Sequence, residues 1–289
     1  MRLDGATFLL QWATGGLACC WVTTRHRMVG LGYGWLLRSV FGAFAAAAAV
    51  LFALDDPTSA RTVALVASVA TSAGAAAALV ASVVRRRAGV SGVHATRAHR
   101  RARVAAMLGR TPDVAPGDAD APGPAELDPR LDLLAPAAGL VGLVAAAVLA
   151  GGPVALAGAR LLVGAVFLGV VTDAMLLGHW YLVQPGLPRD PVRELVVLAA
   201  LVWPLEVAAF LWPTGMLQVF TGAVDDGWDG LLGVIWIVSA ASTLALLGVT
   251  WLALKERSYS AVMAATGLLY LAILMAFGTD LVARAVLAP

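Results

Sequence analysis

Long apolar segments separated by short polar ones constrain the fold of this chain more than any other feature. A transmembrane helix needs about 20 mostly apolar residues to cross the roughly 30 Å hydrocarbon layer. Unpaired backbone groups at that depth cost several kcal/mol each, so only helices satisfy these segments. The sequence therefore predicts an all-α, polytopic transmembrane helical bundle that forms a single domain over residues 1–289. Eight segments qualify, at about 6–24, 32–54, 62–84, 133–151, 154–183, 192–213, 230–253 and 259–287.

The number of spans depends on the stretch "LAGGPVAL", which separates the fourth and fifth segments. This stretch fits a tight turn between two helices, because glycine and proline favour turns. It also fits a break within one membrane-embedded region. The prediction is about eight spans, with seven as the alternative.

The composition supports a membrane location. Hydrophobic residues make up 60% of the chain and charged residues 13%, whereas about a quarter of the residues in a soluble domain are charged. Lys255 is the only lysine, and alanine is the most frequent apolar residue. This bias suggests a GC-rich bacterial genome, so we expect a multi-pass protein of the bacterial plasma (inner) membrane.

The basic residues predict the orientation, because cytoplasmic loops carry an excess of arginine and lysine. Fifteen of the twenty basic residues fall in the first, third, fifth and seventh loops. The opposite loops include "LDDPTSAR" and "GAVDDGWDG", which are acidic. The arginine-rich loops should face the cytoplasm, and both termini should lie outside.

The third loop, residues 85–132, is the one sizeable polar segment, and it has two halves. Residues 85–110 hold eight arginines and no acid, and residues 111–132 hold six acids and five prolines. The first half resembles a basic surface helix and the second a flexible linker. We expect the helix to contact anionic lipid; nucleic acid or an acidic partner protein is the less favoured alternative. The arginines concerned are Arg85, Arg86, Arg87, Arg97, Arg100, Arg101 and Arg103.

Ionisable residues inside the spans are the best pointers to function, because a charge at bilayer depth costs at least about 2.5 to 3.5 kcal/mol. With a rise of 1.5 Å per residue, they sort into an outer and an inner polar layer. Each layer holds both signs of charge, so neutralising pairs are expected, such as Arg160 with Glu206 or Asp280, and Arg38 with Asp173. The candidate ligand or proton residues are Arg38, Arg160, Asp173, His179, Glu206 and Asp280, with Arg284 in the outer layer beside them.

Two of these acids have distinctive surroundings. Glu206 follows Pro204 by two residues, and proline frees the carbonyl four residues earlier, as in the broken helices of transporters. Asp173 and His179 are six residues apart, a net rotation of about 240° on a helix. They therefore do not share a face, and we expect His179 to anchor at the headgroup level beside Trp180 and Tyr181.

No metal site or catalytic motif is predicted, and the cofactor is unknown from the sequence. Cys19 and Cys20 are adjacent, a poor geometry for a disulfide and the wrong spacing for zinc. Internal haem would require a second histidine at the depth of His179. No nucleotide-binding loop, nucleophile elbow or zinc-protease motif occurs.

Three classes of function fit this pattern. The favoured one is a non-enzymatic membrane protein that binds a small, quinone-like ligand or serves as a subunit of a membrane complex, with its buried acids lining a polar interior. The second is a proton- or ion-coupled transporter in which Glu206, Asp280 and Asp173 are protonated in turn. The third is a structural or assembly subunit whose buried charges fix helix register.

Overall fold

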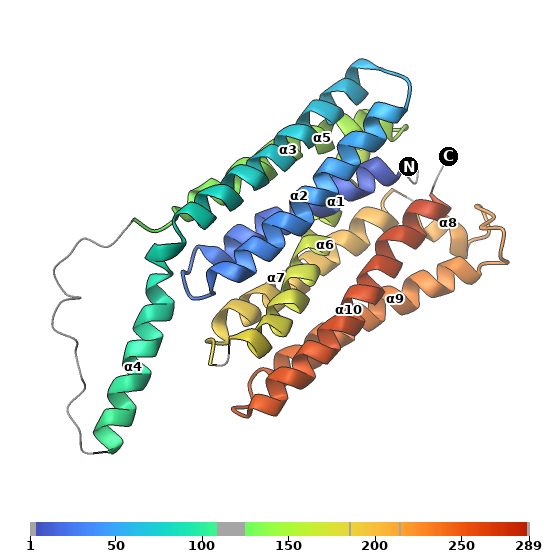
Figure 1. The fold of residues 1–289 in the computed structure, drawn as a ribbon. Helices are drawn as coiled ribbons and strands as arrows, with labels where there is room; N and C mark the ends of the chain where they lie inside the picture. The colour runs from blue at the N-terminus through green and yellow to red at the C-terminus, as the bar shows by residue number, and fades with distance from the viewer. Residues whose placement is uncertain (1–3, 109–124, 185, 214, 288–289) are drawn as a thin grey trace.

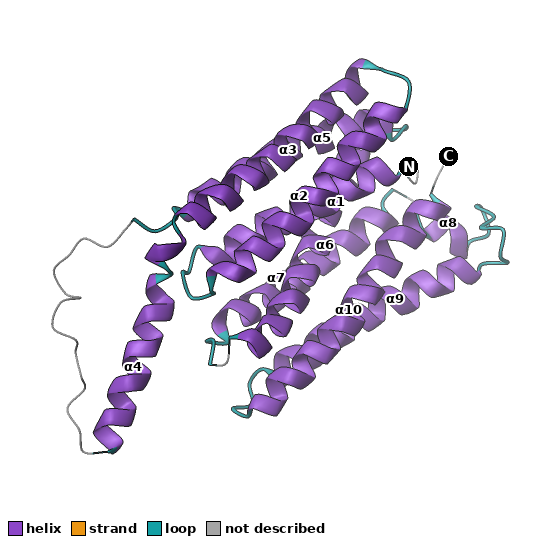
Figure 2. Ribbon diagram, in the orientation of Figure 1, coloured by secondary structure: helices purple, strands orange, loops and turns teal. Residues whose placement is uncertain are grey.

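The chain folds as a bundle of long helices (Figure 1). The computed structural model describes residues 4–108, 125–184, 186–213 and 215–287. These residues form helices and loops, and none of them lies in a strand (Figure 2). The long helices are α1 (Gly5–Thr24), α2 (Leu31–Leu54), α3 (Ser59–Val84), α5 (Leu134–Leu149), α6 (Val154–Val183), α7 (Asp190–Leu211), α9 (Leu231–Ala253) and α10 (Tyr259–Val286).

Four shorter elements complete the chain. A helix of 17 residues, α4, follows α3 and lies beyond one end of the bundle (Figure 1). Most of the acidic, proline-rich half of the third loop falls outside the described residues. The short elements are η1 (Arg86–Ala88), α4 (Ser91–Met107), η2 (Pro129–Leu133) and α8 (Leu217–Phe220).

Seven helical segments are long and apolar enough to cross a membrane: α2, α3, η2 with α5, α6, α7, α9 and α10. The chain is thus a multi-pass membrane protein in contact with a lipid bilayer. The stretch "LAGGPVAL" is a tight turn, as one of the two alternatives predicts. Gly151 and Gly152 take φ angles of 74° and 72°, which glycine adopts without steric cost, and α6 begins directly after Pro153.

Helix α1 is the eighth long helix and falls outside the seven apolar ones. It packs against α6, α2 and α5, so neighbouring helices rather than lipid cover much of its surface. Its polar side chains Thr7, Gln11, Thr14 and Thr23 are accordingly buried. The polar residues that make α1 less apolar therefore face the protein interior.

Helix α6 joins two groups of helices. On one side α1, α2, α3 and α5 pack together, and on the other α7, α9 and α10 do. The backbones of α1 and α6 are in direct contact, since a Cβ on Gly15 would lie 1.7 Å from the carbonyl oxygen of Ala165, and one on Gly169 would lie 2.2 Å from Gly15. Small residues permit this approach.

The two chain termini lie at the same end of the bundle (Figure 1). Loops at that end are α2–α3, α5–α6 and the segment between α7 and α9, which includes α8. Loops at the opposite end are α1–α2, α6–α7 and α9–α10, together with α4. The arginine-rich loops therefore gather at one end, opposite the termini.

Candidate functional site

A buried cluster of four polar side chains lies between α1, α7 and α10. Asp280 and Arg284 are one turn apart on α10, and the Arg284 Nε atom lies 2.6 Å from Oδ2 of Asp280. Gln11 on α1 donates from Nε2 to Oδ1 of Asp280 at 3.4 Å and accepts a hydrogen bond from Arg284. Glu206 on α7 is the fourth member. All four are at most 1% exposed.

Glu206 is the member whose hydrogen-bonding capacity is unused. Neither of its carboxylate oxygens has a hydrogen-bond partner among the described residues. It interacts electrostatically with Asp280 and Arg284, and it faces Asp280 closely enough for a hydrogen bond if one carboxyl carries a proton. Two ionised carboxylates only accept hydrogen bonds, so they repel. A shared proton would make the cluster neutral, since Arg284 offsets one negative charge.

Arg160 lies near this cluster but is bound to backbone. Its Nε donates to the carbonyl of Ala209 and its Nη2 to that of Trp212, both at 2.8 Å. These carbonyls end α7, and a cation there is favourable because the last carbonyls of a helix lack partners. The expected pairing of Arg160 with Glu206 or Asp280 is therefore wrong, and Arg284 takes that role for Asp280.

Asp173 occupies a second buried position, between α6, α1 and α2. It is 0% exposed, and neither carboxylate oxygen has a hydrogen-bond partner among the described residues. Its electrostatic neighbours include Cys19, Cys20 and Tyr33. Tyr33 donates its hydroxyl to the backbone carbonyl of Asp173 at 3.2 Å rather than to the carboxylate.

Arg38, the partner expected for Asp173, and the neighbouring hydroxyl of Thr172 are both engaged elsewhere. Arg38 forms a bidentate pair with Asp132, with distances of 2.7 Å (Nε–Oδ1) and 2.8 Å (Nη2–Oδ2). The hydroxyl of Thr172 donates to the Leu168 carbonyl and accepts from the indole of Trp12. The predicted pair of Arg38 with Asp173 is wrong because Asp132, at the start of the α5 span, lies closer.

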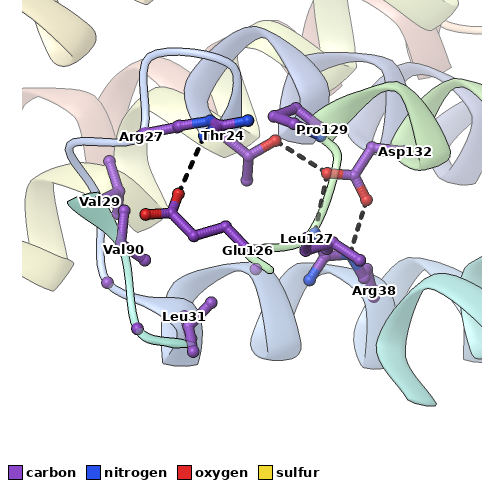
Figure 3. Close-up of a pocket in the computed structure, with 13 residues that line it drawn as sticks. Thr24, Arg27, Val29, Leu31, Arg38, Val90, Glu126, Leu127, Pro129 and Asp132 are labelled. Carbon is purple, nitrogen blue, oxygen red and sulfur yellow. Dashed lines mark hydrogen bonds and ion pairs between the residues drawn. The ribbon is translucent and has the colours of Figure 1, made fainter. Parts of the chain in front are cut away.

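A pocket lies beside the Arg38–Asp132 pair (Figure 3). Thr24 donates to Oδ2 of Asp132 at 2.8 Å, and Arg27 lies 3.1 Å from Glu126 at the opposite wall. The pocket has a volume of about 40 Å³, which suits one or a few water molecules. Arg38 lines this pocket, and neither Asp173 nor Glu206 does.

His179 lies apart from both acids. Its side chain is exposed on the outside of α6, where its ring forms an edge-to-face pair with Tyr270 at 6.4 Å between centroids. The Tyr270 hydroxyl lies 3.4 Å from Nδ1. Asp173 points inward from the same helix, so the spacing argument that separates these two residues holds. In the described part of the chain, no three histidine, cysteine or acidic residues form a group that could hold a metal ion.

Two members of these sites were missed by sequence reasoning. Gln11 is a polar residue in an apolar segment, but the prediction of candidate residues depends on charge and so omits it. The sequence places Asp132 in the loop before the fourth predicted span, although an acid in the first turn of a span has the same need for a partner as one deeper inside. Both side chains are nearly fully buried.

Comparison of the chain with protein-family models, with curated proteins and with solved structures gives no match.

Proposed function

We propose that this chain is a proton-coupled membrane transporter in which the Glu206–Asp280 pair binds and releases the proton. The proposal is supported by the cluster of Gln11, Glu206, Asp280 and Arg284, which we call the outer cluster. It contains one more carboxyl group than it contains cations. Arg284 already has a carboxylate partner in Asp280, yet Glu206 is buried next to the pair with both oxygens unpartnered among the described residues. An acid in that position is stable only when a proton neutralises one of the two carboxyls.

A purely structural role explains this cluster less well. Fixing the register of α10 against α1 requires a cation, one acid and the amide of Gln11, which are already mutually hydrogen-bonded. Glu206 adds a charge without a partner, which a structural pair does not need. The surplus acid therefore favours proton chemistry over a scaffold.

A quinone-like ligand, which the sequence alone favours, is also less well supported. Asp173 and Glu206 are each 0% exposed and are surrounded by packed helices. A drug-sized ligand site occupies about 300 Å³ or more, whereas the pocket in Figure 3 has a volume of about 40 Å³. The hollows of about 420 to 580 Å³ lie elsewhere, and neither acid lines them. A proton needs no such cavity.

The separation of the two buried acids supports coupled transport rather than a continuous proton channel. Gly164 lies beside Asp280, since a Cβ there would be 3.1 Å from Oδ1. Asp173 follows nine residues later on α6, a rise of about 14 Å. Between these levels the backbones of α6 and α1 touch at Gly15, which leaves no room for a water chain along that contact. We propose that the acids are reached from opposite sides in different conformations.

We further propose the orientation that the arginine distribution predicts. The arginine-rich end, with the loop of residues 85–132, faces the cytoplasm of a bacterial plasma membrane, and both termini lie outside. The arginines of η1 and α4 then face the anionic lipid of the inner leaflet. In this proposal the whole chain forms one transmembrane domain.

Proton binding is tested by infrared spectroscopy of the purified chain in lipid during a pH titration. We expect a protonated carboxylic acid signal that Glu206→Gln removes. Glu256→Gln, at an exposed position in the α9–α10 loop, is the matched control and should leave the signal intact. A signal that persists unchanged in Glu206→Gln would contradict the assignment.

Coupling is tested separately in liposomes that contain a pH-sensitive dye, to which one class of small solute at a time (sugars, amino acids, organic acids or inorganic cations) is added outside. A solute that the wild-type chain transports together with protons should change the pH of the lumen faster than in empty liposomes. Glu206→Gln should reduce the rate to that of empty liposomes, and Glu256→Gln should not. Equal rates for the wild type and Glu206→Gln would remove the transport function even if the site binds a proton.

A further inference from the structure

The basic helix α4 lies across the arginine-rich end of the bundle. It begins at Ser91, seven residues after α3 ends at Val84, so its start is held within about 25 Å of the end of a membrane-spanning helix. Near its N-terminus, a Cβ on Gly92 would be 2.4 Å from the carbonyl of Arg27 in the α1–α2 loop. Further along, the Arg100 guanidinium meets Gly186 of the α6–α7 loop. Helix α4 therefore stays at the level of these loops.

Among the described residues, no carboxylate forms an ion pair with the arginines of α4. Glu126, which lies at the start of the helix, is engaged by Arg27 and Ser91. The exposed arginines are Arg97, Arg100, Arg101 and Arg103.

A groove between α4 and the α6–α7 loop combines this charge with apolar side chains. Its volume is about 420 Å³, large enough for a phospholipid headgroup. Arg100, Arg103 and His99 provide cationic or hydrogen-bonding groups, and Thr96 provides a hydroxyl. Val104 and Met107 continue the groove with apolar surface and are 50% and 77% exposed.

We infer that this groove binds the headgroup of one anionic phospholipid, with its phosphate between Arg100 and Arg103 and the start of its acyl chains along Val104 and Met107. The inference rests on the proposed contact of the α4 arginines with lipid and adds a defined site to it. Guanidinium groups bind phosphate oxygens through paired, charge-assisted hydrogen bonds.

The mixture of charged and apolar groups favours lipid over nucleic acid. A nucleic acid backbone would require successive cations along a polar track, whereas this groove passes from arginine to methionine within two turns of helix. An amphiphile matches that change, and the position of α4 next to a membrane-spanning helix makes lipid the adjacent ligand.

The test uses the full chain in neutral detergent and native mass spectrometry with added phosphatidylglycerol. We expect one phosphatidylglycerol to be retained with an apparent Kd at least about tenfold lower than that of zwitterionic phosphatidylcholine. The double variant Arg100→Gln/Arg103→Gln should raise the Kd for phosphatidylglycerol about tenfold or more, a change that the loss of two charge-assisted hydrogen bonds readily accounts for.

The matched control removes the same charge away from the groove. Arg101 is rotated by about 100° from Arg100 on the helix, and neither Arg87 nor Arg101 lines the groove. Arg87→Gln/Arg101→Gln should change the Kd less than about twofold. Equal weakening by both double variants would overturn the site and leave only a diffuse attraction of α4 to anionic lipid.

Two further measurements test the hydrogen-bond geometry of the site and the class of its ligand. Arg100→Lys/Arg103→Lys keeps the charge but loses the paired geometry, so its Kd should fall between those of the wild type and the glutamine variant. A short single-stranded DNA should not displace the bound phosphatidylglycerol at equal concentration. Displacement would overturn the lipid assignment in favour of nucleic acid.

Discussion

The two buried Arg–Asp pairs among the described residues neutralise their arginines in different surroundings. At the arginine-rich end, Arg38 and Asp132 form a bidentate pair whose second acceptor oxygen also receives Thr24. At the other end, Arg284 and Asp280 form a pair beside an additional acid, Glu206. Arg284 also keeps one nitrogen, Nη1, without a partner among the described residues. The first pair is complete, whereas under the proposed function the second gains and loses a proton without leaving its arginine unpaired.

The largest expected effect is the loss of the complete pair. Asp132→Asn removes the only carboxylate that binds Arg38 among the described residues; the Arg38 side chain is 3% exposed. Leaving a buried charge without its partner costs about 3–5 kcal/mol. We expect the free energy of unfolding in mixed detergent micelles to fall by that amount.

The control for this prediction is the exposed pair of Asp190 and Arg193, 3.8 Å apart. Asp190→Asn should change stability by less than about 1 kcal/mol. Replacing both buried partners, as in Arg38→Met/Asp132→Leu, should restore most of the stability. If Asp132→Asn is no more destabilising than Asp190→Asn, the inner pair does not stabilise the fold.

A smaller effect is expected when the same change is made at the outer pair. In Asp280→Asn, Glu206 remains next to Arg284 and can replace the lost carboxylate. We therefore expect a loss of about 1–2 kcal/mol, below the range for a buried charge left unpaired. Glu206→Gln alone should be neutral or slightly stabilising, because it removes the surplus acid.

The double variant Asp280→Asn/Glu206→Gln tests whether both acids neutralise Arg284. It leaves Arg284 without any carboxylate, so its destabilisation should approach that of Asp132→Asn and exceed the sum of the two single changes. Such non-additivity reports a direct interaction between the acids. Additive effects, or a single Asp280→Asn variant as unstable as Asp132→Asn, would show that the two pairs are alike and that Glu206 has no share in binding Arg284.

The sequence predicts the elements of this fold well but the charge pairs poorly. Span length and apolar composition depend on local sequence, so helices at the eight expected segments, including the turn at Gly151 and Gly152, follow directly. Pairing depends on helix rotation and on which helices are neighbours. Arg38 could meet Asp132 or Asp173 by depth alone, and only the packing of η2 and α5 beside α1 and α3 selects Asp132.

The same limit explains the residues that depth alone could not separate. His179 and Asp173 both belong to the inner layer, but one is exposed and the other buried, as their rotation on a helix predicts. Arg160 is expected at the same depth as Asp280, yet its guanidinium donates hydrogen bonds to carbonyls at the end of α7. No sequence signal marks those carbonyls, because they become acceptors only where α7 ends.

The smallest expected effect concerns a carboxylate stabilised by backbone instead of arginine. Asp226, in the loop before α9, accepts hydrogen bonds from the backbone N–H groups of Gly230, Trp228 and Leu232, each at 2.9 Å. The hydrogen bond from Gly230 is the largest cause that lowers the pKa of Asp226, and those from Trp228 and Leu232 add to it. A lowered pKa in the folded state means that this stabilisation is present above the unfolded pKa and is lost as the pH falls through the folded pKa.

Because Asp226 is only half-buried, Asp226→Asn should reduce the thermal stability only slightly near neutral pH, and the difference from the wild type should vanish in acid. Thermal unfolding of both proteins from neutral to acidic pH measures this. The acid-dependent loss of thermal stability at Asp226 is a local effect in this loop, so it should be unchanged in a Glu206→Gln background. A dependence on Glu206 would instead connect the α7–α9 segment to the outer cluster, where Arg160 already joins the end of α7 to the vicinity of Arg284.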